Sequence, residues 1–123
     1  MIKLIDLLTE AVIACGKCLS YVWKISAKFS GNKSVNKKMK IVYGTVQNKW
    51  ISDGKRYRHA WIEYAGKVMD WQTMEAGLSK YAGKGWPKKE FYKHWHPKID
   101  RIYSPSEVIN NYAEKKTIIG WDW

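Results

Sequence analysis

Apolar residues at the start of the chain recur at steps of three and four, the spacing of one face of a helix. This apolar face consists of Ile2, Ile5, Leu8, Val12 and Cys15. Gly16 interrupts the pattern, because glycine costs about 1 kcal/mol relative to alanine inside a helix. The next apolar segment, CLSYVWKISAKF, predicts a second helix from about Cys18 to Phe29.

The middle of the chain changes to the pattern of strands. SGNKSVNKK, residues 30–38, has loop composition and no apolar periodicity, so we expect a mobile loop there. MKIVYGTVQNKWI, residues 39–51, is rich in β-branched and aromatic residues and predicts a strand. Gly44 inside it indicates a bulge or a close backbone approach. SDGKR, residues 52–56, is the expected turn.

Two further strand patterns, at residues 58–64 and 67–72, flank the dipeptide at 65–66 and predict a tight hairpin. A two-residue turn there pairs Ile62 with Met69. Since successive side chains of a strand point to opposite faces, this pairing decides which residues meet across the hairpin.

The last third of the chain is less regular. Residues 76–100 contain three glycines and two prolines among lysines and aromatics, and predict no definite element. SPSEVINNYAEKK, residues 104–116, predicts a helix capped by Ser104 or Ser106, and TIIGWDW, residues 117–123, a possible edge strand. These elements predict an α+β fold, with N-terminal helices packed on an antiparallel sheet. The length fits a single domain over residues 1–123.

Composition and charge exclude some classes of protein. Apolar residues make up 46% of the chain and aromatics 15%, unlike a disordered segment. Basic residues number 22 against 11 acidic ones, and residues 31–60 hold eight bases and one acid. Such a basic block attracts phosphate, an anionic membrane surface or an acidic protein, and equally serves as a solubilising face.

The cellular compartment is also suggested by the sequence. No run approaches the roughly 18 apolar residues of a membrane helix. Asp6 and Glu10 lie inside the first apolar segment, where a secretory signal does not normally carry carboxylates. Two cysteines form no disulfide framework, so we expect a cytoplasmic protein without a membrane span.

Three residues fit the needs of a nucleophilic thiol. Such a thiol requires a base, a group that orients the base, and donors for the developing oxyanion. Cys18 follows Gly16 at a predicted helix start, where the helix dipole favours a thiolate. In the predicted hairpin Asp70 lies nearly opposite Trp61 and diagonal to His59 on the same face. Its carboxylate can fix the imidazole tautomer that accepts the thiol proton.

These residues resemble a known family. GKCLSYV, RHAWIEY and GKVMDWQT are similar to the Cys, His and Asp segments of the transglutaminase-like group, within the papain-like cysteine peptidase superfamily. Bacterial lasso-peptide leader peptidases share much the same His-Ala-Trp strand. The resemblance covers Gly16 to about Thr73, and implies a papain-like fold with Cys18 as nucleophile, His59 as base and Asp70 as orienting acid.

The resemblance also implies a reaction. We expect thiol-dependent acyl transfer from a peptide or protein amide, by a cysteine peptidase, a deamidase or a transglutaminase, with no cofactor or metal. The backbone N–H of Cys18 is the expected first oxyanion donor, and Gln47 or Trp50 the second. The lysine-rich segment suggests an acidic substrate or partner.

Other interpretations remain open. Cys15 and Cys18 form a C-x-x-C, typical of a redox dithiol, or of half a zinc site completed by His94 and His96 on a strand.

The basic stretch from 33 to 58 could instead bind nucleic acid, with Tyr43, Trp50 and Tyr57 as stacking platforms. A similar fold that has lost catalysis and only binds a partner is a further alternative.

Overall fold

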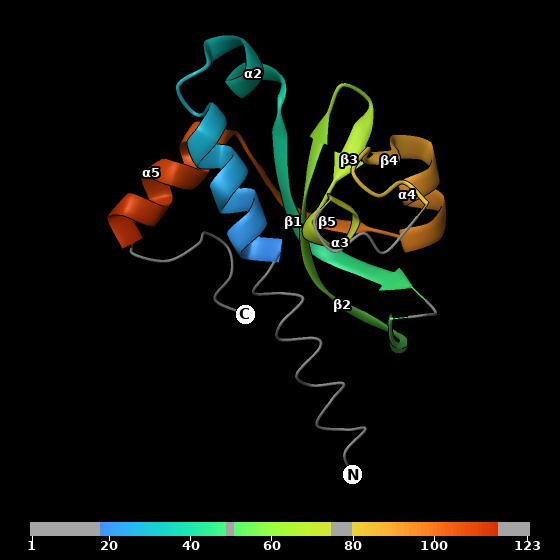
Figure 1. The fold of residues 1–123 in the computed structure, drawn as a ribbon. Helices are drawn as coiled ribbons and strands as arrows, with labels where there is room; N and C mark the ends of the chain where they lie inside the picture. The colour runs from blue at the N-terminus through green and yellow to red at the C-terminus, as the bar shows by residue number, and fades with distance from the viewer. Residues whose placement is uncertain (1–17, 49–50, 75–79, 116–123) are drawn as a thin grey trace.

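The computed structural model describes residues 18–48, 51–74 and 80–115, and its sheet is the centre of the fold (Figure 1). The strands are β1 (Lys40–Asn48), β2 (Ile51–Tyr64), β3 (Lys67–Met69), β4 (Trp86–Pro87) and β5 (Lys98–Tyr103). They lie in the order β4-β3-β2-β1-β5, and every pair is antiparallel.

Helices cover both faces of this sheet. They are the helix over residues 18–29, α2 (Lys33–Lys38), α3 (Trp71–Met74), α4 (Lys88–Trp95) and α5 (Pro105–Lys115). The helix over residues 18–29 and α5 lie on one side, and α4 lies on the other (Figure 1). The predicted α+β class with an antiparallel sheet is confirmed, and so is the helix predicted from Cys18 to Phe29.

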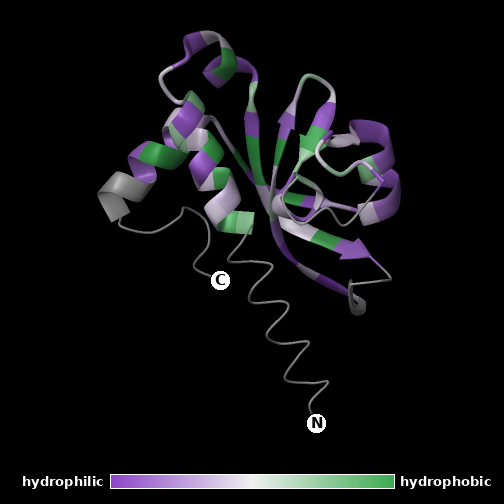
Figure 2. Cartoon of the chain, viewed as in Figure 1, coloured by the Kyte–Doolittle hydropathy of each residue, from purple (hydrophilic) through white to green (hydrophobic). Residues whose placement is uncertain are grey.

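The two faces of the sheet bury two separate apolar clusters. The first cluster joins the helix over residues 18–29 and α5 to alternate residues of the central strands: Cys18, Tyr21, Val22, Met39, Ile41, Tyr43, Ala60, Ile62 and Val108. The second joins α4 and β4 to the other alternate residues: Val42, Val46, Tyr57, Trp61, Val68, Trp86, Phe91 and Trp95. Because both faces of β1 are covered, its residues from Ile41 to Val46 are buried almost without interruption, and its hydrophobic residues lie between hydrophilic ends (Figure 2).

The hairpin forms as predicted and is shorter than predicted. Ile62 pairs with Met69, and both turn residues, Ala65 at φ 52° and Gly66 at φ 77°, are left-handed, as a two-residue turn between twisted strands requires. The return strand was expected to reach residue 72 but ends at Met69. The chain enters α3 there, because Asp70 Oδ1 accepts the backbone N–H of Thr73 at 2.7 Å and caps that helix.

Gly44 marks a bulge, as expected. The pairing of β1 with β5 shifts register between Tyr43 and Gly44, and a Cβ at Gly44 would overlap the carbonyl oxygen of Lys98. Only glycine therefore allows the two backbones to approach this closely.

Two predictions for the preceding segments are wrong. Residues 30–38 contain α2 instead of a loop, because Asn32 caps the helix by accepting the Val35 N–H at 3.1 Å. SDGKR belongs to β2 instead of forming the turn: Asn48 pairs with Ile51 and Gln47 with Arg56, so residues 52–55 bulge out of the pairing with β1.

The helix at residues 104–116 is confirmed as α5. Ser104 N–H donates to Glu107 Oε1 at 2.9 Å, and Glu107 N–H donates to Ser104 Oγ at 3.3 Å, which is a reciprocal capping box. The predicted first helix and the predicted C-terminal edge strand lie outside the described residues. Within the described part, no helix is both long and apolar enough to span a membrane.

Candidate active site

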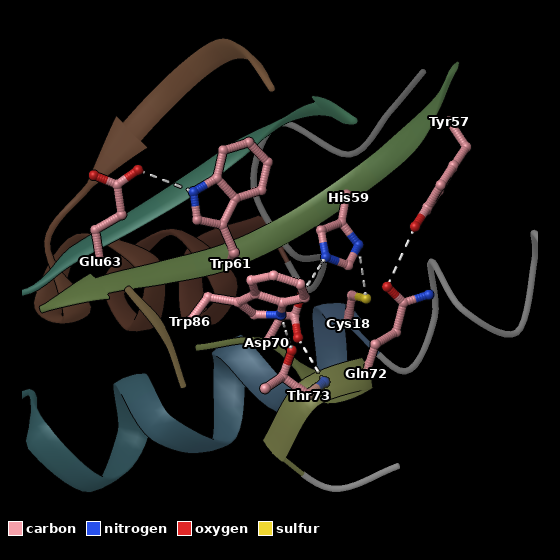
Figure 3. A network of polar contacts seen from close by, with 9 residues as sticks. All are labelled: Cys18, Tyr57, His59, Trp61, Glu63, Asp70, Gln72, Thr73 and Trp86. Atoms are coloured by element: carbon pink, nitrogen blue, oxygen red, sulfur yellow. Dashed lines mark hydrogen bonds and ion pairs between the residues drawn. The ribbon is translucent and has the colours of Figure 1, made fainter. Parts of the chain in front are cut away.

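Cys18 and His59, 41 residues apart in the chain, meet at the edge of the sheet (Figure 3). Cys18 is the first described residue of its helix, and its Sγ lies 3.1 Å from Nδ1 of His59. β3 does not extend as far as His59, because it pairs only with residues 62–64 of β2. The helix on one face and the segment after β3 can therefore both reach the imidazole.

Asp70 holds the other side of the same ring. Its Oδ2 lies 2.8 Å from Nε2 of His59, while its Oδ1 accepts the Thr73 N–H. Trp86 Nε1–H donates to Thr73 Oγ1 at 2.8 Å, which ties α3 to β4. The carboxylate is thus fixed at both oxygens, and the structure brings Cys18, His59 and Asp70 together.

The charges around His59 favour its protonated form. Burial opposes the charge, but the neighbouring Cys18 and the hydrogen bond to Asp70 outweigh it and raise the pKa of His59 from 6.5 to about 10. An imidazolium has an N–H at both ring nitrogens, so it donates to Sγ and to the carboxylate at once. A protonated His59 therefore has a hydrogen-bond acceptor at each of its two ring nitrogens.

Aromatic rings enclose this imidazole. Trp61 stacks at 5.9 Å between centroids with an interplanar angle of 26°, and Trp95 at 6.2 Å and 4°. Tyr57 meets the ring edge-on at 5.8 Å. The faces of indoles attract cations, so the two tryptophans support the charged ring and keep water from it. Trp95 Nε1–H itself is buried and has no hydrogen-bond partner in the described structure.

Glu63 fixes one of these indoles. Its Oε2 accepts Trp61 Nε1–H at 3.1 Å and the Tyr92 hydroxyl at 2.6 Å, and its Oε1 lies 3.3 Å from Lys88 Nζ. Burial raises the pKa of Glu63, but these bonds outweigh burial and lower it. The last residue of the His-Ala-Trp-Ile-Glu segment therefore stays ionised and joins β2 to α4.

Tyr57 and Gln72 form a further polar contact beside the sulfur (Figure 3). The Tyr57 hydroxyl donates to Gln72 Oε1 at 3.2 Å. Burial raises the pKa of Tyr57, as do the charges at Cys18 and Asp70, so the phenol stays a donor. Sequence reasoning missed this pair and Trp95. Tyr57 had one available signal, since it shares a strand face with His59 two residues away.

The predicted second oxyanion donors are not supported. Gln47 Nε2–H already donates to the Gly54 carbonyl at 2.8 Å, across the bulge at the end of β1 and β2. Trp50 lies outside the described residues.

The zinc hypothesis does not fit the described residues. His94 lies on α4 and pairs with Glu90 at 3.2 Å, and His96 follows the helix with φ 45°, so the two do not share a strand face. Cys18 meets His59, and Cys15 lies outside the described part of the chain. No group of three metal-binding side chains occurs in that part.

Two of the three stacking platforms of the nucleic-acid hypothesis are buried, and the third, Trp50, lies outside the described residues. Tyr43 is 0% exposed and Tyr57 is 9% exposed, and each belongs to one of the two apolar clusters. Neither ring is available to stack on a base.

The chain matches no protein-family model, no curated protein and no solved structure.

Proposed function

We propose that the protein is a thiol-dependent acyl-transfer enzyme of papain-like, transglutaminase-like type, with Cys18 as nucleophile, His59 as base and Asp70 as orienting acid. The observation that carries the proposal is the continuous contact from Sγ through both ring nitrogens to the carboxylate, at 3.1 and 2.8 Å. Both distances are within hydrogen-bond reach, as a nucleophile, its base and the group that orients the base require.

The first half of the reaction forms a thioester. The thiolate of Cys18 attacks the carbonyl carbon of an amide, so a C–S bond forms and negative charge moves to the carbonyl oxygen. The Nδ1 proton of His59 passes to the amide nitrogen as the C–N bond breaks, and the amine leaves. Asp70 keeps Nε2 hydrogen-bonded throughout and so holds the imidazole in register.

The second half regenerates the enzyme. An acceptor attacks the thioester carbonyl, its proton passes to Nδ1 of His59, and the C–S bond breaks to restore thiolate and imidazolium. Water as acceptor gives a peptidase or deamidase, and an amine gives a transglutaminase.

Access to the sulfur needs a conformational change. The side chains of Cys18, His59 and Asp70 are all 0% exposed. A substrate carbonyl therefore reaches Sγ only after part of the surrounding protein has moved, and opening becomes a step of the catalytic cycle.

The decisive experiment is the pH profile of iodoacetamide alkylation in a Cys15→Ser background, which leaves Cys18 as the single thiol. The size of the alkylation rate reports how accessible the sulfur is to the reagent, whereas the midpoint of the pH profile reports the ionisation of the thiol. We expect the pH profile to change in His59→Gln, because that variant lacks the imidazole that lies 3.1 Å from Sγ. Identical midpoints with and without His59 would refute the thiolate–imidazolium pair.

Formation of the acyl-enzyme is the matching chemical test. The same single-thiol protein, incubated with an activated peptide ester, should gain the mass of the acyl group on Cys18. Asp70→Asn should retain alkylation but acylate more slowly, because the imidazole loses its preferred tautomer. If no acyl adduct forms at any pH at which Cys18 is alkylated, the proposed enzymatic activity is rejected, and a binding protein is the remaining interpretation.

A further inference from the structure

Four lysines from separate elements converge on one concavity at the turn of the β2–β3 hairpin. The concavity has a volume of about 160 Å³, and its lining includes Lys38, Lys40, Lys67 and Lys88, together with Glu63. The hairpin turn and α2 lie toward the same end of the molecule (Figure 1). The fold thus gathers charges that are up to 50 residues apart in the sequence.

The positive charge of this lysine concavity is largely uncompensated. Glu63 pairs with Lys88 and also accepts hydrogen bonds from Trp61 and Tyr92, so its charge is already engaged. No ion pair is formed by the other three lysines with any described residue, and all three are exposed. Four ammonium groups around one carboxylate leave a site that favours an anion.

We propose that the lysine concavity binds carboxylate side chains of an acidic segment in the peptide substrate. This inference rests on the proposed function for its position relative to the reacting amide. Peptide carboxylates fit better than nucleic-acid phosphates for two reasons. The lining has no arginine among the described residues, although guanidinium is the group that matches phosphate bidentately. The tyrosines once expected to stack on bases are buried.

The distance to the thiol sets the position of the acidic residues. Glu63 follows His59 by four residues on β2, which corresponds to about 13 Å at a strand rise of about 3.3 Å per residue. An extended peptide advances by the same rise. Acidic side chains four to six residues from the reacting amide would therefore reach the lysine concavity while the carbonyl lies at Cys18.

Binding is tested without any chemistry. A fluorescein-labelled peptide with three consecutive glutamates, and its glutamine counterpart, are titrated with the full chain at low and at high salt. Lys40→Gln/Lys67→Gln is compared with Lys84→Gln/Lys98→Gln, which has the same net charge but lies outside the concavity. We expect at least fivefold weaker binding of the glutamate peptide for the first pair and less than twofold for the second.

Each other outcome rejects the site. Equal losses in the two double variants would mean attraction to net charge alone, and equal binding of the glutamine peptide would exclude carboxylate recognition. Tighter binding of a single-stranded oligonucleotide, lost in the same variant, would assign the concavity to nucleic acid. These binding measurements do not require Cys18 to form a thioester, so they test the lysine concavity independently of the proposed function.

The position is tested by moving the glutamates along an activated peptide ester and measuring the rate at which Cys18 is acylated. We expect a maximum four to six residues from the ester, and its loss in Lys40→Gln/Lys67→Gln. A flat profile would reject this separation between the reacting amide and the lysine concavity.

Discussion

Trp61 lies between the ionised carboxylate of Glu63 and the imidazole of His59, with its indole N–H on the first and its face on the second. Three successive positions on one buried face of β2 are thereby linked in a fixed geometry. The link gives the final Glu of the His-Ala-Trp-Ile-Glu segment a role in positioning the His59 ring, which it does not itself touch. His59 is held by Asp70 at Nε2 and by Trp61 and Trp95 on its faces.

Replacement of Glu63 tests this link. Glu63→Gln keeps the shape but removes the charge that three donors share, and we expect a loss of about 1–3 kcal/mol in the free energy of unfolding. Glu90→Gln breaks an exposed pair with His94 and should change stability by less than about 0.5 kcal/mol. Denaturant unfolding measures both. If Glu63→Gln leaves the free energy of unfolding unchanged, the charge of the carboxylate is not needed for stability.

The raised pKa of His59 predicts how the stability of the protein depends on pH. Its imidazole should titrate near 10 by NMR, and clearly lower in Cys18→Ser, because the charge at the sulfur is the largest cause that raises the pKa. A raised folded-state pKa stabilises the fold fully below about 6.5 and loses that contribution as pH rises toward 10. The stability advantage of wild type over His59→Gln should therefore shrink across this window.

A His59 titration that is unchanged in Cys18→Ser would contradict the charge pairing. An advantage over His59→Gln that grows with pH would contradict it as well, since it would mean that the neutral imidazole is the stabilising form.

Local patterns predicted the part of the site that local geometry controls. The two-residue turn pairs Ile62 with Met69 and so brings Asp70 near His59, as the sequence predicted, although Asp70 caps α3 instead of extending β3. The meeting of Cys18 with His59 did not follow from a local pattern, because nothing periodic relates residues 41 apart, and only the resemblance of the motifs indicated it.

The contact of Trp95 with His59 was not predicted because the helix that carries Trp95 has a weak sequence pattern. Trp95 lies on α4, an eight-residue helix that buries only Phe91 and Trp95 and that belongs to a segment rich in glycine and lysine. The helix is stabilised by packing against the sheet and not by its own periodicity, as short helices generally are. α2 differs, because it buries none of its residues and is instead capped by Asn32.

Trp95 is predicted to act through its ring and not through its N–H. Trp95→Phe keeps an aromatic face on His59 and removes a buried donor without a partner, so stability should stay within about 1 kcal/mol of wild type or rise. Trp95→Leu removes the face and should cost about 2–4 kcal/mol. Thermal unfolding of the two variants measures this difference. A Phe variant as unstable as the Leu variant would mean that the indole N–H has a partner after all.

The bulge at Gly44 gives the last prediction, which concerns the backbone opposite His59. Gly44 pairs with His59 on one side, and on the other side a Cβ would overlap the Lys98 carbonyl. Gly44→Ala must therefore displace β5, and we expect a loss of about 3 kcal/mol or more in unfolding free energy. Gly31→Ala, where no atom lies within 4 Å of the new methyl, is the matched control and should be neutral or slightly stabilising. Hydrogen exchange should show the loss first in β5 amides, because β1 is the one strand that pairs with β5 among the described residues. Uniform weakening of the whole sheet would instead mean that the strain passes through Gly44 into β2 and the His59 backbone.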